Sequence, residues 1–380
     1  QADLYAMGFS SLIHIYSSGS PEALRDHLAA LYREAGSLSG AVFVGDIPYI
    51  IYEVMQKWSA TGASQYEDFP CDIFFMDLDG TWADVLDEGS VRAGNLKYDT
   101  RSGDLGLEIW VSRIRTDNLG LLGSETDLLK AYFDKNHRYR RQEILPGNQA
   151  LVYNDDDWKT MAGSDSLRMG LLYGDTQVTA IYDPSLTTAS DFKTNQLTAP
   201  FEFIAVRSHG WTGGHGFYDG GQYERIYAQD YGAINPSAVF YSLFVCSGSD
   251  YTADNNLAGS IAFNPSDSGL LAVGTTKTGG MWNENVFYSA LSTRAIFGEA
   301  FRQWFNSIAD RSDAPKWWYG MVLMGDGALA RNAFAAYPCT GDKDSDQDVD
   351  GVDLSAFIAG PGAGNPLELI LFSQDFGKDR

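Results

Sequence analysis

Residues 201–210 read FEFIAVRSHG, and residues 239–248 read VFYSLFVCSG. Each stretch is a mainly apolar run with the length of a buried strand, and each ends in a reactive side chain followed by a small residue. The first run ends at His209 and the second at Cys246. Because a connection of helix length separates the two runs, we expect neighbouring parallel strands, whose ends lie about 4.8 Å apart at one edge of a sheet.

The rest of the chain repeats this strand-then-helix pattern, which is typical of an α/β fold. Because several expected strands are nearly continuous apolar runs, we predict a doubly wound, mostly parallel sheet with helices on both faces. The expected strands span residues 10–16, 41–44, 107–114, 149–155, 177–183, 201–208, 238–246, 270–276 and 319–325. The expected helices span residues 21–34, 125–141 and 285–310, and residues 49–100, rich in Asp and Gly, are predicted to form a surface excursion.

Turn signals and a change in composition predict three parts of the chain. A Leu-Pro-Gly-Asn turn at residues 145–148 separates an N-terminal α/β subdomain, residues 1–147, from a catalytic α/β subdomain, residues 148–337. Residues 338–380 form a third segment. No charged-then-apolar leader follows Gln1, so we expect any signal peptide to have been removed or never to have been included in this sequence.

The composition describes an acidic folded protein. Of its 380 residues, 44% are hydrophobic and 20% are charged, and the formal net charge is −23. This charge disfavours binding to nucleic acid or anionic lipid, because both require a positive surface, and it favours cations such as calcium. No apolar run reaches the length of about 18 residues that a membrane span needs. The three cysteines, Cys71, Cys246 and Cys339, are too widely spaced to predict a disulfide framework or a zinc site.

A thiol beside an imidazole is the minimum for acyl transfer, because the imidazole accepts the proton and the thiolate attacks. Gly210 lacks a Cβ, so its backbone N–H can approach a substrate carbonyl and form an oxyanion hole with the N–H of Cys246. The alternative is structural, since a lone cysteine or histidine is more often a core residue than a catalytic one. His215 is also followed by glycine, but His209 directly ends its strand and is the favoured base.

Several motifs resemble those of known peptidases. Arg207-Ser208-His209-Gly210, with the later Phe244-Val245-Cys246-Ser247, resembles the pattern of the caspase-like clan of cysteine peptidases. Further segments resemble the gingipain family within that clan. They are Val44-Gly45-Asp46-Ile47-Pro48, Glu108-Ile109-Trp110-Val111-Ser112-Arg113, residues 270–276 with Trp282 following, and Leu323-Met324-Gly325-Asp326.

The resemblance implies a two-subdomain peptidase with His209 and Cys246 as the catalytic dyad, Gly210 as an oxyanion donor and Trp282 lining the specificity pocket. Gingipain-like enzymes use an acidic residue near the end of the strand that residues 149–155 match. The resemblance therefore implies that one of two carboxylates orients His209 and that one of two others faces a basic substrate side chain. The first pair is Asp155 and Asp156, and the second is Asp157 and Asp165. The family fold also has a strand before the element at Gln1, so we expect the first subdomain to lack it.

Residues 342–353 read DKDSDQDVDGVD and match the spacing of a twelve-residue calcium loop. Gln347 stands where glycine is usual, and the segment resembles a dockerin-type half-repeat. This pattern predicts a structural calcium ion, a cohesin-like or cell-surface partner, and an extracellular location of bacterial type. An acidic tail is the alternative. The predicted ligands are Asp342, Asp344, Asp346, Asp348, Asp350 and Asp353.

We predict a secreted cysteine endopeptidase that forms a thioester acyl-enzyme and cleaves a protein or peptide after a basic residue. No organic cofactor is expected. Two alternatives remain: a catalytically inactive peptidase-like scaffold protein attached through its dockerin-like tail, or a peptide ligase of the same clan.

Overall fold

The structure is a computed structural model that describes residues 1–17, 19–36, 38–57, 62–331 and 351–359. The chain divides into two compact units, Gln1–Ala330 and Arg331–Arg380. In the second unit the described residues are Arg331 and helix α12 (Gly351–Ala359). The predicted boundary at residues 147 and 148 falls inside the first unit, and the division into two subdomains there stays a prediction.

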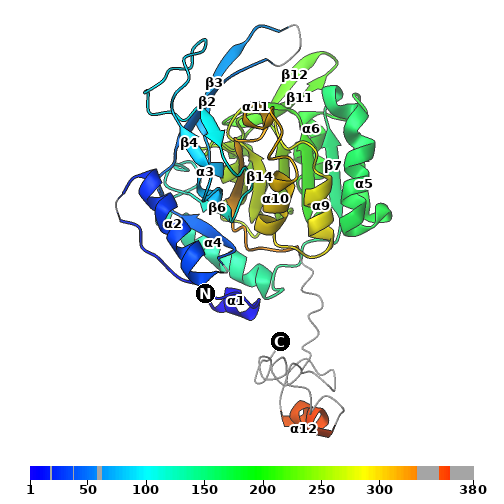
Figure 1. The fold of residues 1–380 in the computed structure, drawn as a ribbon. Coiled ribbons are helices and arrows are strands. Elements are labelled where there is room, and N and C mark those ends of the chain that lie inside the picture. The colour runs from blue at the N-terminus through cyan, green and yellow to red at the C-terminus, as the bar shows by residue number, and fades with distance from the viewer. Residues whose placement is uncertain (18, 37, 58–61, 332–350, 360–380) are drawn as a thin grey trace. The chain divides into compact units, whose positions relative to one another are not determined.

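An eight-stranded sheet forms the centre of the first unit, with the strand order β1-β6-β15-β14-β13-β9-β7-β8 (Figure 1). Its neighbouring strands are parallel except for β14 and β15, which are antiparallel. The prediction of a mostly parallel α/β fold is therefore confirmed. The strands are β1 (Gly40–Val44), β6 (Trp110–Ile114), β7 (Ala150–Asn154), β8 (Val178–Ile181), β9 (Phe203–Arg207), β13 (Phe240–Phe244), β14 (Leu271–Thr275) and β15 (Met321–Gly325).

Helices pack against this sheet; for example, α10 contacts β6, α5 contacts β7 and β8, and α8 contacts β14. The helices of the first unit are α1 (Ala2–Ala6), α2 (Pro21–Ala35), α3 (Ile73–Met76), α4 (Glu125–Arg140), α5 (Ala162–Tyr173), α6 (Ala189–Asp191), α7 (Ala228–Ile234), α8 (Leu257–Ala262), α9 (Asn285–Ser292), α10 (Phe297–Asn306) and α11 (Ala314–Trp317). Among the described residues, no helix is both long enough and apolar enough to cross a membrane.

Local sequence explains where the long helices begin. The Ser20 side chain accepts a hydrogen bond from the backbone N–H of Ala23 at the start of α2, and Pro21 occupies the first turn. The Ser124 side chain accepts one from the N–H of Asp127 at the start of α4. Four strands of the sheet, β6, β7, β14 and β15, are buried at every residue, which accounts for their continuous apolar sequences.

Two elements differ from the prediction. Residues 10–16 form no strand, and their apolar side chains Leu12, Ile13 and Ile15 are 74%, 68% and 85% exposed. A strand-like composition is insufficient where the backbone has no neighbouring strand to pair with. Residues 285–310, predicted as one helix, form α9 and α10, which are separated by a turn in which Arg294 adopts a positive φ of 70°.

The stretch predicted as a surface excursion is partly a core element. It contains the antiparallel hairpin of β2 (Ile51–Gln56) and β3 (Gln65–Pro70), and the hairpin of β4 (Thr81–Ala83) with β5 (Thr100–Ser102). All four residues of α3 are buried. The apolar run of Ile73-Phe74-Phe75-Met76 is short, which is why its burial was missed.

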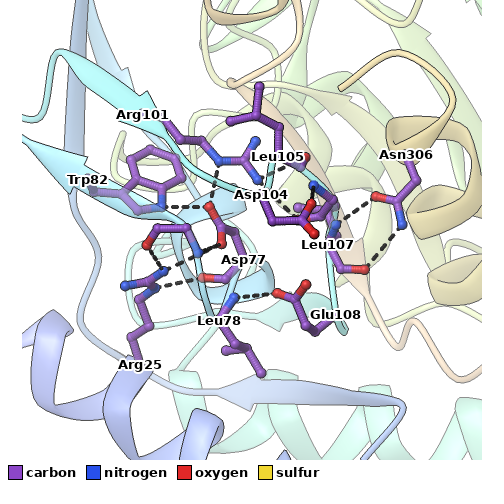
Figure 2. Close-up of polar contacts among 12 residues, drawn as sticks. Arg25, Asp77, Leu78, Trp82, Arg101, Asp104, Leu105, Leu107, Glu108 and Asn306 are labelled. Carbon is purple, nitrogen blue, oxygen red and sulfur yellow. Dashed lines mark hydrogen bonds and ion pairs between the residues drawn. The ribbon is translucent and has the colours of Figure 1, made fainter. Parts of the chain in front are cut away.

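Asp77 ties this stretch together (Figure 2). Its carboxylate lies 2.5 Å from the Arg101 guanidinium, 2.9 Å from the Trp82 indole N–H and 3.5 Å from Arg25 of α2. The buried carboxylate therefore joins α2, β4 and β5, and its charge is balanced by two arginines.

A second antiparallel sheet extends from β9 and consists of β10 (His209–Trp211), β11 (Gly214–Asp219) and β12 (Gln222–Tyr227). In Figure 1 the β2–β3 and β11–β12 hairpins stand at the top of the first unit, on either side of α11.

Candidate active site

The ends of β9 and β13 bring the two predicted catalytic residues to one edge of the sheet. The strands are parallel neighbours with Arg207 opposite Phe244, and the Ser208 N–H donates a hydrogen bond of 3.2 Å to the carbonyl of Phe244. His209 and Cys246 each follow two residues after the last residue of its strand. The parallel pairing of these two strands, which the sequence predicts, is therefore confirmed.

The His209 imidazole is held by a carboxylate and by aromatic rings. Its Nε2 lies 2.8 Å from the Asp157 Oδ2, so Nε2–H donates and Nδ1 is left to accept a proton. The Trp158 ring centroid lies 4.7 Å from the imidazole, and the Tyr218 ring centroid lies 6.0 Å from it. The Tyr223 hydroxyl donates to the His209 carbonyl over 3.0 Å. The side chain of His209 is 42% exposed, which leaves it open to a substrate.

The Cys246 sulfur accepts a hydrogen bond of 3.4 Å from the Gly279 N–H. Burial raises the pKa of this thiol, and the nearby Glu67 carboxylate adds to the increase, whereas the Gly279 N–H and Lys277 oppose it. A thiol with a raised pKa is protonated at rest, so a general base is needed to generate the thiolate. Ser247 adopts a positive φ of 55°, which turns the chain sharply after Cys246.

Neither predicted orienting carboxylate is the one bonded to the imidazole. Asp155 directly follows β7, is fully buried and accepts a hydrogen bond of 3.1 Å from the Tyr218 N–H. Burial raises its pKa, and the nearby His209 opposes this increase. Asp156 begins a short 3-10 helix, Asp156–Met161, and that turn brings the next residue, Asp157, to the histidine. Asp155 thus fixes the β11 strand beside His209, while Asp157 makes the direct contact.

Asp165 on α5 is committed to buried ion pairs. Its carboxylate lies 2.7 Å from Arg207 and 2.7 Å from Arg168. Glu284 pairs with the same two arginines at 2.5 Å and 3.3 Å. Two carboxylates and two guanidinium groups form a neutral cluster, so Asp165 does not present an unbalanced charge to a substrate.

Trp282 lies against the end of the nucleophile strand. Its ring centroid is 4.8 Å from that of Phe244, and the Arg207 guanidinium lies 5.7 Å from the Trp282 ring centroid. The indole N–H of Trp304 donates to the Trp282 carbonyl over 2.9 Å, which fixes the backbone. Trp282 is therefore close to the active-site edge and sits over the neutral cluster.

Gly210 is required by close packing. A Cβ there would lie 2.3 Å from the Val245 side chain and 2.7 Å from the Gly214 carbonyl oxygen. His215, opposite Gly210 in the β10–β11 pair, is fully buried. Its Nδ1 lies 3.0 Å from the Ser208 hydroxyl and its Nε2 2.8 Å from the Tyr231 hydroxyl. Burial lowers its pKa to about 3, so it is a neutral structural histidine.

Several residues at this site were missed from the sequence, namely Glu67, Tyr218, Tyr223, Lys277 and Gly279. A detectable signal was the Gly279-Gly280 pair, which follows the strand adjacent to β13 in the sheet. Paired glycines after a strand mark a close approach of backbone to a neighbouring group. The other four carry no local signal, because they reach the site through tertiary contacts.

Asp77, Asp79 and Glu108 also lie close enough together to hold a metal ion. Asp77, however, already contacts Arg25 and Arg101, and Glu108 accepts a hydrogen bond of 2.6 Å from the Leu78 N–H (Figure 2). Both Asp77 carboxylate oxygens are thus already bonded to guanidinium groups, so these three residues do not fit a metal site.

Of the predicted calcium ligands, Asp342, Asp344, Asp346, Asp348 and Asp350 lie outside the described residues. Asp353 lies near the start of α12 and is buried within its own unit.

Comparisons with known proteins give a family match and several similar solved structures. Residues 5–331 match the profile of peptidase family C25. The crystal structure of the Arg-specific cysteine proteinase gingipain R (RgpB) is similar, with a TM-score of 0.56 and 14% identity over 83% of this chain and 69% of that chain. The complex of Porphyromonas gingivalis RgpB pro- and mature domains has a TM-score of 0.56 and 15% identity, over 82% of this chain and 70% of that one.

A search of curated proteins finds no match for the chain. At 14% or 15% identity the structural likeness shows a common fold, whereas the family profile covers most of the sequence. The chain therefore belongs to peptidase family C25 and is a cysteine-type peptidase that acts on protein or peptide substrates.

Proposed function

We propose that the chain is an endopeptidase in which Cys246 is the nucleophile and His209 the general base. The observation that carries the proposal is the parallel pairing of β9 with β13, because these two residues follow the paired strand ends at one edge of the sheet. His209 Nδ1 takes the thiol proton, and the sulfur attacks the scissile carbonyl. The proton then passes to the leaving amine, and water hydrolyses the thioester to release the acid and regenerate the thiol.

Two further residues have roles in this scheme. The N–H groups of Gly210 and Cys246 stabilise the oxyanion of the tetrahedral intermediate. The absence of a side chain at Gly210, enforced by Val245 and Gly214, supports this role. Asp157 stabilises the imidazolium that forms when His209 is protonated.

Replacing the nucleophile tests the proposal. Cys246→Ala should abolish cleavage of a mixed peptide library, and iodoacetamide should label Cys246 in the wild type and stop cleavage. Cys71→Ala is the matched control, because Cys71 is fully buried and its thiol pKa is raised by burial. Equal turnover by Cys246→Ala and wild type would remove Cys246 from the mechanism. A chain that neither cleaves nor reacts would instead support the scaffold alternative.

A preference for a basic residue before the scissile bond remains a proposal. Asp165 is paired within the protein and Asp157 contacts His209, so the support for a basic preference is the net charge of −23. Cleavage rates for matched Arg, Lys, Gln and Asn peptides measure this preference directly. Equal rates for Arg and Gln would contradict it, and transfer of the acyl group to added amines would support the ligase alternative.

We also propose that residues 342–353 bind calcium and that the chain is secreted, with the C-terminal segment contacting a cohesin-like or cell-surface partner. The support is the spacing of six aspartates in the sequence. Calorimetric titration of the whole chain with calcium should show binding that Asp346→Asn and Asp353→Asn weaken. Unchanged binding in both variants would exclude this loop.

A further inference from the structure

The nucleophile is supported by a loop that a distant part of the chain fixes. Residues 277–279 follow β14, and they contact Cys246 and its neighbour from one side. The Gly279 N–H donates to the Cys246 sulfur over 3.4 Å, and the Lys277 carbonyl accepts a hydrogen bond of 2.7 Å from the Ser247 N–H. The position of this loop therefore sets both the environment of the sulfur and the turn that presents it.

Glu67 on β3 binds this loop through both carboxylate oxygens. Its Oε1 accepts a hydrogen bond of 3.1 Å from the Thr278 N–H. Its Oε2 lies 2.7 Å from the Lys277 ammonium and also accepts a hydrogen bond from the Gln56 side chain on β2. Glu67 thus bonds to both Lys277 and Thr278, the two residues that precede Gly279. These contacts join the β2–β3 hairpin to the loop beside Cys246.

The contact is shielded from water. The Lys277 side chain is fully buried and that of Glu67 is 17% exposed. The ammonium is also held by the carbonyls of Thr278 and Lys316, at 3.0 Å and 2.8 Å. A buried, multiply bonded pair restrains geometry far better than a surface ion pair, which is worth little.

We propose that Glu67 is a positioning residue for the nucleophile: it holds residues 277–279 so that the Gly279 N–H points at the Cys246 sulfur and stabilises the thiolate. The inference rests on the proposed function, since it assigns Glu67 to the same Cys246. In this account each member of the dyad is held by a different hairpin. The β2–β3 hairpin supports Cys246 through Glu67, and the β11–β12 hairpin contacts His209 through Tyr218 and Tyr223.

Two substitutions disturb this contact in different ways. Glu67→Asp keeps the charge and both oxygens but is shorter by one methylene, whereas Glu67→Gln keeps the length but replaces one acceptor oxygen with an NH2 donor. Because each variant breaks part of the contact with residues 277–279, both should lower kcat by about tenfold or more, with KM changed by less than about twofold. Alkylation of Cys246 by iodoacetamide at neutral pH should fall in parallel in Glu67→Asp.

Asp68→Asn is the matched control, because Asp68 lies on the same strand and pairs with Lys97 on the solvent side, where its side chain is 43% exposed. It should behave as wild type. A normal kcat in Glu67→Asp, or an effect confined to KM, would overturn the proposal. If Glu67→Asp does not fold, a normal kcat in a folded Glu67→Gln overturns it as well. Cys246→Ala distinguishes the two levels: activity in that variant ends the proposed function, whereas an inactive Cys246→Ala beside a normal Glu67→Asp ends this inference alone.

Discussion

Asp157 Oδ2 lies 2.8 Å from His209 Nε2, in the first turn of the short 3-10 helix that follows β7. The carboxylate and the histidine are 63% and 42% exposed, so their contact is formed at the surface of the active-site edge. A carboxylate in this position fixes the imidazole tautomer and stabilises the imidazolium. Because the pair is exposed, water also stabilises the imidazolium, and the contribution of the Asp157 carboxylate is smaller.

Asp157→Asn should therefore lower kcat/KM by about tenfold, less than the loss expected for a buried orienting carboxylate. Steady-state cleavage of a fluorogenic peptide measures the change, and thermal unfolding should remain near that of wild type. Asp156→Asn is the comparison, because Asp156 does not contact His209. A larger loss in Asp156→Asn would transfer the orienting role to that residue.

Gly210→Ala should destabilise the protein by about 1–3 kcal/mol, because the new methyl group meets Val245 and the Gly214 carbonyl at less than contact distance. Cleavage should also fall, because relieving these contacts must shift the backbone that carries the Gly210 N–H. Gly163→Ala on α5 is the control: a Cβ there meets nothing within 4 Å, and stability should be unchanged or higher. Denaturant unfolding compares the two, and equal stability of both variants would contradict the packing account.

Asp165→Asn should cost about 3 kcal/mol of unfolding free energy, because Arg207 and Arg168 would then share a single buried carboxylate, Glu284. The ratio of cleavage rates for Arg and Gln peptides should not change, since Asp165 is already paired in the free protein. A selective loss of Arg cleavage with unchanged stability would show that Asp165 faces the substrate instead.

The buried His215 should make the free energy of unfolding depend on pH. Burial lowers its pKa from 6.5 to about 3 in the folded protein, so the unfolded chain binds a proton that the folded chain does not. The unfolding free energy should therefore fall as pH decreases from about 6.5 towards 3, by up to about 1.4 kcal/mol per pH unit from this group. In His215→Gln that contribution should vanish, which denaturant unfolding at pH 7, 6 and 5 measures. Identical slopes in variant and wild type would contradict a buried neutral His215.

The fold was largely predictable because its information is local. Strands β7, β9, β13 and β14 are mainly apolar runs bounded by turn residues. Such short runs indicate buried strands of a parallel sheet. The helix starts at Ser20 and Ser124 follow from capping within three residues. Residues 10–16 show the limit, because a strand also needs a partner that its own sequence does not specify.

The sequence by itself determined that His209 and Cys246 closely follow two strands, since strand length and chain connection are properties of neighbouring residues. Only the tertiary structure decided which carboxylate contacts the histidine, that Asp165 is neutralised by Arg207, and that Glu67 reaches the loop beside the sulfur. Those contacts join residues tens to hundreds of positions apart. A shift of one residue along the chain changes which side chain points toward the site, and the local sequence pattern does not specify that direction.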